Sequence, residues 1–136
     1  MIVYSLIRRN LKLLFRFGLV GISGTVVNIS TYFIFTNIYN FNVNSASILS
    51  FFIAVGNNYL LNHYWTFIEV TRGRPSSIKG FFQYISVNII GLIVNLIILN
   101  LLIYNFGLEF HIQAQLLGIL SGMMLNFIFS KKVVFN

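Results

Sequence analysis

The chain has 136 residues, of which 57% are hydrophobic and only 8% are charged, whereas soluble domains carry about 25% charged residues. This composition predicts an integral membrane protein. Nine Lys and Arg face two acids, giving a formal net charge of +7, and in a membrane protein we interpret such bases as topology signals rather than nucleic-acid contacts. The sequence has no cysteine, which excludes disulfides, thiolate nucleophiles and cysteine-ligated metals.

The first uncharged region is too long for a single membrane crossing. No Asp, Glu, Lys or Arg lies between Phe17 and Ile68. One helix of that length would run about 78 Å, whereas the hydrocarbon core of a bilayer is about 30 Å thick. The asparagines between Asn37 and Asn44 favour a turn. We therefore predict membrane spans at about 17–37 and 44–64.

Two further spans follow a polar connection. Bases, Pro and Ser fill the segment from Glu69 to Lys79, and uncharged stretches then run over residues 80–108 and 110–130. These stretches predict spans at about 81–104 and 111–130. The expected fold is an all-α integral membrane bundle of four transmembrane helices.

All nine basic residues lie at span ends on one side of the predicted membrane, and Glu109 lies on the other side. Because bases are concentrated in cytoplasmic segments, we predict a multi-pass plasma membrane protein with both termini and the central loop in the cytoplasm. Residues 1–16 are expected to form either a short interfacial helix or a plain positive-inside anchor. The bases are Arg8, Arg9, Lys12, Arg16, Arg72, Arg74, Lys79, Lys131 and Lys132.

The two halves of the chain are similar in sequence. With a shift of 67 residues, Gly24 and Asn28 meet Gly91 and Asn95. We interpret residues 1–136 as one domain, with repeat 1 at about 15–67, a cytoplasmic loop at 68–80 and repeat 2 at about 81–135. A two-span unit repeated after an even number of crossings keeps its orientation, which predicts parallel repeats. With a shift of 68, positions spaced by four also recur: Ala46, Ser50, Ala54, Asn58 and Asn62 meet Ala114, Gly118, Gly122, Asn126 and Ser130.

Small and amide side chains in these repeats have different expected roles. Residues four apart share a helix face, and Ala, Ser or Gly at such positions lets helices approach closely in lipid. The small residues are therefore expected to be packing positions. An amide in a membrane needs hydrogen-bond partners, so Asn28, Asn58, Asn95 and Asn126 form either interhelical hydrogen bonds or a polar track for a lipid head group.

Titratable groups are too few and too dispersed to suggest catalysis. The predicted topology separates His63 and Glu69 from His111 and Glu109 by about 30 Å, and their spacing matches no metal or nucleophile motif. We predict a protein that is not an enzyme and that has no cofactor or metal site. The bases at the cytoplasmic surface either bind lipid phosphates or serve only topology and snorkelling. These are Arg16, His63, Lys79, Lys131 and Lys132.

Three segments resemble the GtrA-like family of small four-span membrane proteins: 15–28, 57–67 and, more weakly, 125–135. The resemblance covers about residues 12–136. It implies transfer of polyprenyl-phosphate-linked sugars, made by a partner membrane glycosyltransferase, from the cytoplasmic to the outer leaflet. There they decorate cell-envelope polysaccharide or teichoic acid. The chain departs from the family pattern at His63, where Arg is usual, and at Val133, where its second exit lacks Trp. A similar domain is fused to some dolichol-phosphate mannose synthases.

The expected function is therefore that of a flippase for a polyprenyl-phosphate-linked monosaccharide, or an essential subunit of one. The absence of an acid within a span favours uncoupled transport. One alternative is a non-transporting scaffold or anchor subunit of a glycosyltransferase. Others are a small multidrug exporter, which would need an intramembrane Glu, and a holin-like pore former. Assembly into a homo-oligomer is left open, and no nucleic-acid partner is expected. Candidate phosphate and sugar contacts are Arg16, Asn28, Asn58, Asn62, His63, Asn95, Asn126, Lys131 and Lys132.

Overall fold

The computed structural model describes the backbone of residues 2–133 and the side chains of residues 7–126. Within this part of the chain all regular structure is helical and no strand occurs, which confirms the all-α fold class. The elements are α1 (Ile2–Phe33) with its π-helical continuation η1 (Ile34–Ile38), α2 (Val43–Leu61) with η2 (Asn62–Thr66), α3 (Ile68–Thr71), α4 (Ile78–Phe106), the 3₁₀ turn η3 (Leu108–Phe110) and α5 (His111–Val133).

The helices begin and end at residues suited to leaving the helical conformation. Asn40 has a left-handed backbone (φ 56°), which asparagine tolerates better than most residues. Asn42 caps α2 by accepting a hydrogen bond from the amide of Asn44 (2.9 Å). Ser77 caps α4, and Gly107 (φ 101°) ends it. Apart from the start of α1, the helix bounds lie within three residues of the predicted spans.

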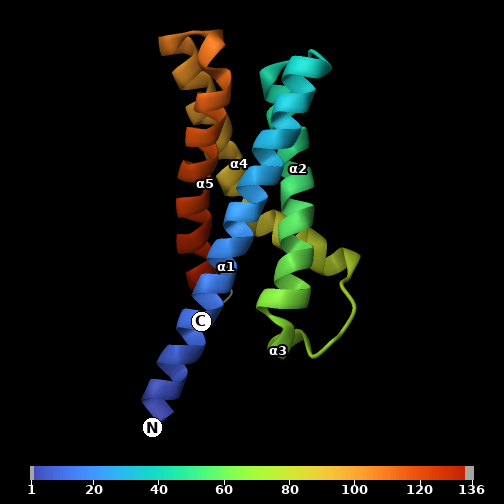
Figure 1. Ribbon diagram of the computed structural model, residues 1–136, viewed down its shortest axis with the longest axis vertical. Helices are drawn as coiled ribbons and strands as arrows, with labels where there is room; N and C mark the ends of the chain where they lie inside the picture. Colours follow the sequence, from blue (N-terminus) through green and yellow to red (C-terminus); the bar gives the residue numbers. More distant parts are fainter. Residues whose placement is uncertain (1, 134–136) are drawn as a thin grey trace.

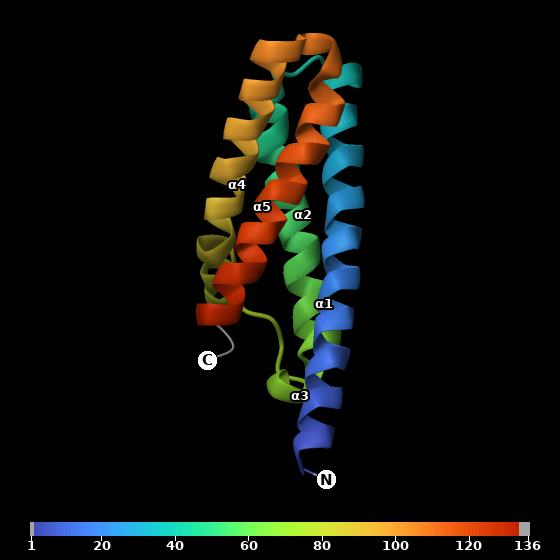
Figure 2. The same cartoon turned by 90° about the vertical axis from the view of Figure 1, so that its left-hand side faces the viewer.

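The N-terminal basic segment belongs to α1 and is not a separate helix. α1 runs without interruption over 32 residues, or about 48 Å at 1.5 Å per residue. Residues 2–16 therefore continue the axis of the first predicted span. Leu11, Leu14 and Phe15 on this extension are exposed, because it reaches past the rest of the bundle (Figure 2).

Among the residues that the structure describes, two helices are long and apolar enough to cross a membrane, judged by length and composition. They are Ile7–Ile38 and Ile78–Phe106, with mean hydropathies of 1.5 and 2.4 in their most apolar windows. Ser and Asn are more frequent in α2 and lower its hydropathy. The exterior is also apolar on α2 and α5, with side chains such as Phe52 and Leu117 exposed. The four-span organisation stays a prediction.

The four long helices form two antiparallel hairpins that lie against each other (Figures 1 and 2). α1 packs along α2 and α4 along α5, and further contacts join α2 to α4 and α1 to α5. The first half of α1, α3 and the start of α4 lie at one end of the bundle (Figure 1). We call this the basic end, since the Lys and Arg with described side chains lie in these segments or in the connection between α3 and α4. The turns at 39–42 and 107–110 lie at the opposite end.

Close packing is strongest between α4 and α5. A Cβ atom on Gly122 would lie 2.6 Å from the carbonyl oxygen of Gly91, and one on Gly118 would lie 2.8 Å from that of Asn95. These glycines let the two backbones approach, as small residues do at helix interfaces in membranes.

Candidate functional site

A cavity of about 470 Å³ lies between α1, α2, α4 and α5, within the usual range of about 300–1000 Å³ for small-ligand pockets. Its lining runs on α1 from Phe17 to Asn28 and on α4 from Tyr84 to Asn95, so it occupies the half of the bundle nearer the basic end. None of the described residues that line it is charged. Its polar character comes mainly from six asparagines: Asn28, Asn58, Asn62, Asn88, Asn95 and Asn126.

Two of these asparagines lie against glycines of the neighbouring helix. A Cβ atom on Gly24 would be 2.7 Å from Cγ of Asn58, and one on Gly91 would be 2.8 Å from Cγ of Asn126. Any larger residue at either glycine would displace the amide. The first pair joins α1 to α2 and the second joins α4 to α5, so each hairpin contains the same arrangement.

A relay of amides fixes the orientation of Asn126. Asn88 Nδ2 donates to the backbone carbonyl of Tyr84 (2.8 Å), and a carbonyl can only accept. The oxygen of Asn88 therefore faces Asn126, whose Nδ2 donates to it (3.0 Å). The oxygen of Asn126 is left without a partner in the described part of the chain.

The cavity ends at a layer of buried amide contacts between the hairpins. Gln115 Nε2 donates to Asn28 Oδ1 (3.0 Å), and Asn95 Nδ2 donates to Ser47 Oγ (3.2 Å). Gln115 and Ser47 are both fully buried. The first pair joins α5 to α1, and the second joins α4 to α2. The hairpins meet along two seams, α1 with α5 and α2 with α4, and each seam therefore has one buried polar contact at this level.

Beyond this layer, two further polar contacts close the opposite end. Tyr32 Oη lies 3.1 Å from His111 Nδ1, between α1 and α5. Asn44 and Asn100 exchange amide hydrogen bonds of 3.3 and 2.7 Å between α2 and α4. Tyr32 and Leu99 in this half are fully buried. The bundle is therefore hollow toward the basic end and sealed toward the opposite end.

The structure brings the predicted amides together. Five candidate site residues line the cavity, and these are Asn28, Asn58, Asn62, Asn95 and Asn126. Gln115 and Tyr84 were not predicted from the sequence. Gln115 occupies the position of Ser47 when the second half is shifted by 68 residues. The replacement of a small residue by an amide at this repeat position is the sequence feature that could have pointed to Gln115.

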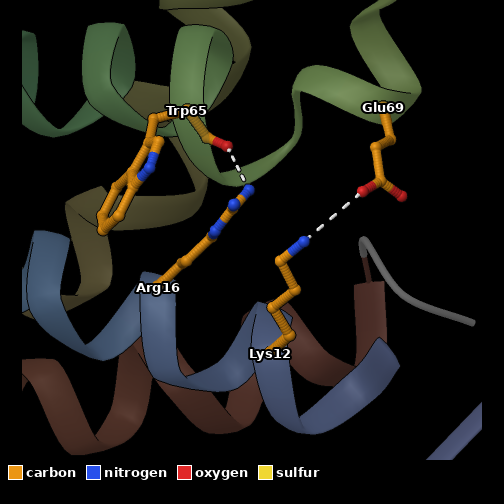
Figure 3. A network of polar contacts seen from close by, with 4 residues as sticks. All are labelled: Lys12, Arg16, Trp65 and Glu69. Atoms are coloured by element: carbon orange, nitrogen blue, oxygen red, sulfur yellow. Dashed lines mark hydrogen bonds and ion pairs between the residues drawn. The ribbon is translucent and has the colours of Figure 1, made fainter. Parts of the chain in front are cut away.

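Arg16 lies at the basic end, outside the cavity lining (Figure 3). Its Nη1 donates to the backbone carbonyl of Trp65 (3.0 Å), and its guanidinium lies 5.4 Å from the centre of the Trp65 ring, an arrangement typical of a cation–π contact. One turn earlier, Lys12 Nζ lies 3.9 Å from a carboxylate oxygen of Glu69. Arg16 thereby ties α1 to the end of η2, a role that the sequence did not predict.

His63 holds the connection between the hairpins rather than lining the cavity. Its Nε2 lies 2.7 Å from the backbone carbonyl of Arg74, while Tyr64 Oη donates to Ser76 Oγ (3.2 Å). The side chains of Lys131 and Lys132 lie outside the described residues. Within the described part, no group of three or more His, Asp or Glu is placed to hold a metal ion.

With this geometry in place, sequence comparison assigns the family. A family described as "GtrA/DPMS, transmembrane domain" matches residues 16–135. The chain belongs to the GtrA/DPMS transmembrane-domain family. It is also 25% identical over 118 residues to the "Uncharacterized membrane protein YwcD" of Bacillus subtilis (strain 168), covering 87% of this chain and 92% of that protein. The GtrA/DPMS membership confirms the resemblance seen in the sequence. It makes the chain a membrane protein and associates it with the processing of polyprenyl-phosphate-linked sugars.

Proposed function

We propose that this chain moves a polyprenyl-phosphate-linked monosaccharide from the cytoplasmic to the outer leaflet, for glycosylation of cell-envelope polysaccharide or teichoic acid. The observation that carries the proposal is the uncharged, asparagine-lined cavity inside a bundle with an apolar exterior. Such a cavity offers hydrogen bonds to a sugar where lipid offers none. The polyprenyl tail stays in the surrounding lipid.

The proposed topology has four spans, with both termini and the central loop in the cytoplasm. Its support is the gathering of the described Lys and Arg at the basic end (Figure 1), the distribution expected of cytoplasmic segments. In this topology the cavity faces the cytoplasm and the sealed half faces outward. The structure then corresponds to a state ready to receive the sugar from the side on which it is made.

The two hairpins are proposed to be parallel repeats that move relative to each other. Support comes from the Gly24–Asn58 and Gly91–Asn126 arrangements, which occur once in each hairpin at matching positions. For the sugar to leave outward, the buried contacts of Asn28 and Asn95 across the seams have to part. No acid lines the described cavity, so the motion is proposed to be uncoupled from protons.

Cations at the basic end are proposed to receive the lipid phosphate. Arg16 uses one of its five N–H donors in the hydrogen bond to the carbonyl of Trp65, so the remaining donors can bind a phosphodiester. Lys131 and Lys132 are proposed to act with it. A membrane glycosyltransferase that makes the lipid-linked sugar is the proposed partner, and the chain itself is proposed to be non-catalytic.

A strain lacking this gene tests the proposal, because the amount and leaflet of its polyprenyl-phosphate-sugar can be compared with the sugar content of its envelope polymers. Accumulation of the lipid on the cytoplasmic leaflet, together with undecorated polymer, is the expected result. Loss of the lipid-linked sugar itself would instead mean that the protein supports its synthesis as a scaffold of the transferase. Re-expression of the wild-type chain is the matched control, since it should restore both quantities.

A further inference from the structure

We propose that the cavity selects an uncharged, hydroxyl-bearing head group and keeps the phosphate outside at the basic end. Asn62, Asn95 and Asn126 are proposed as the residues that determine this specificity. The identity of the carrier lipid rests on the proposed function above. The selectivity follows from the cavity alone.

Three residues that line the cavity have a buried amide oxygen without a donor in the described part of the chain. They are Asn62, Asn95 and Asn126, and the first two side chains are only 4% and 3% exposed. A buried acceptor left without a partner carries the cost of its lost hydration. A ligand that supplies donors to these oxygens therefore gains that energy on binding.

The orientation of these amides is set by the protein. The relay from Tyr84 through Asn88 engages the nitrogen of Asn126 within the protein and leaves its oxygen without a donor among the described residues. Asn62 Nδ2 donates to Tyr84 Oη (3.0 Å), and Asn95 Nδ2 donates to Ser47 Oγ. All three amides thus use their nitrogen within the protein, and the oxygen is the atom of each that still lacks a partner in the described part of the chain.

In two other asparagines of the lining, the oxygen rather than the nitrogen is engaged within the protein. The oxygen of Asn28 accepts from Gln115 (3.0 Å), and the oxygen of Asn58 accepts from Asn57 (3.4 Å). Among the described residues, neither Nδ2 donates to a protein acceptor. The cavity therefore offers donors as well as acceptors, and a hydroxyl is the group that can donate to one and accept from the other.

The absence of charge in the described lining further limits the class of ligand. None of the described lining residues is Asp, Glu, Lys, Arg or His, so neither a carboxylate nor an ammonium group would meet a counter-charge there. Burying an unpaired ion is far more costly than burying a hydrogen-bonded neutral group. A neutral sugar therefore fits, whereas an acidic or amino sugar does not. The phosphate belongs at the basic end beside Arg16.

Binding of three matched ligands to the full-length protein in nanodiscs tests the inference. The ligands are short-chain prenyl phosphates that carry a neutral hexose, a hexuronic acid or an aminohexose. The neutral hexose is expected to bind at least about tenfold more tightly than either charged ligand, because each charged group would be buried without a counter-charge. Equal affinities, or no saturable binding of any of the three, would overturn the proposal.

An added carboxylate in the cavity should invert this preference. Asn126→Asp keeps the shape of the side chain but supplies a counter-charge for an ammonium group, so aminohexose binding should strengthen and hexose binding should weaken. Asn105→Asp is the matched control, because Asn105 is exposed on α4 and outside the lining. Asn62→Asp is a second variant should Asn126→Asp fail to fold. Unchanged preference in a folded variant would contradict the assigned residues.

Transport of the same three ligands, measured with the protein in proteoliposomes, separates the two proposals. Selective binding without any transfer between leaflets would leave the selectivity standing and refute translocation. Transfer of all three head groups at equal rates would refute the selectivity and leave translocation standing.

Discussion

The two halves of the bundle use the same kind of residue in opposite ways. Toward the basic end, Asn62 and Asn126 line a cavity, and their amide oxygens have no partner in the described part of the chain. Toward the opposite end, Asn44 and Asn100 satisfy each other with two hydrogen bonds. An asparagine in a membrane helix is thus a packing contact or part of a site depending on whether its neighbours complete its hydrogen bonds.

The largest expected effect comes from locking the sealed half. Asn44→Cys with Asn100→Cys, joined by a short thiol-reactive cross-linker, should abolish transport, because the hairpins can no longer separate at α2 and α4. The absence of native cysteine makes the reaction specific, and a reductant that cleaves the cross-linker should restore activity. Tyr64→Cys with Ser76→Cys is the control, since these residues meet at the basic end. Full transport by the locked Asn44–Asn100 pair would contradict a moving seam.

The second largest effect is expected from substitutions beside the cavity, in the half of the bundle nearer the basic end. Gly24→Ala and Gly91→Ala should each lower transport about tenfold, the result of losing roughly one well-placed hydrogen bond. The added Cβ would collide with the amide of Asn58 or Asn126. Gly56→Ala provides the control, because a Cβ there meets nothing within 4 Å. Equal activity of all three variants would mean that the amide positions do not matter.

A smaller effect, on stability alone, is expected where α4 meets α5. Gly122→Ala should lower the free energy of unfolding by about 1–3 kcal/mol, because its Cβ would press on the carbonyl oxygen of Gly91 (2.6 Å), a backbone atom with little room to shift. Thermal unfolding in detergent measures this change against Gly56→Ala. A variant as stable as that control would show that the helices can part at no cost.

The smallest effects are expected at the exposed contacts of the basic end. Lys12→Met should change the free energy of unfolding by no more than about 0.5 kcal/mol. The side chains of Lys12 and Glu69 (Figure 3) are 57% and 68% exposed, and Lys12 Nζ lies 3.9 Å from the carboxylate oxygen. Arg16→Lys should cost about 1 kcal/mol, through loss of the planar contact with Trp65. The fluorescence of the single tryptophan reports the change at Arg16 directly. No shift in that signal would place the guanidinium away from the ring.

Much of the fold could be predicted because charges and turn residues mark the helix ends. The turn around Asn40 and the polar connection before Ser77 were both found within three residues. The start of α1 was missed, since no helix-breaking residue separates the basic segment from the span that follows.

The candidate site was predicted less completely. Spacing alone indicated Asn28, Asn58, Asn95 and Asn126, because helical periodicity shows which residues share a face. The relay through Tyr84 and the contact of Gln115 depend on how the two hairpins pack, which periodicity within one helix does not determine. For the same reason the contact between Arg16 and Trp65, residues far apart in the sequence, could not be predicted.

Transfer of a polyprenyl-phosphate-hexose between leaflets of proteoliposomes that contain only the purified protein tests the central claim most directly. The wild-type chain should equilibrate the lipid between leaflets, and Asn58→Leu with Asn126→Leu should reduce transfer to the rate of empty liposomes while the protein stays folded. The Asn105→Leu control should behave as wild type. Wild-type transfer no faster than in empty liposomes, or full transfer by the folded double variant, would contradict a route through the asparagine-lined cavity.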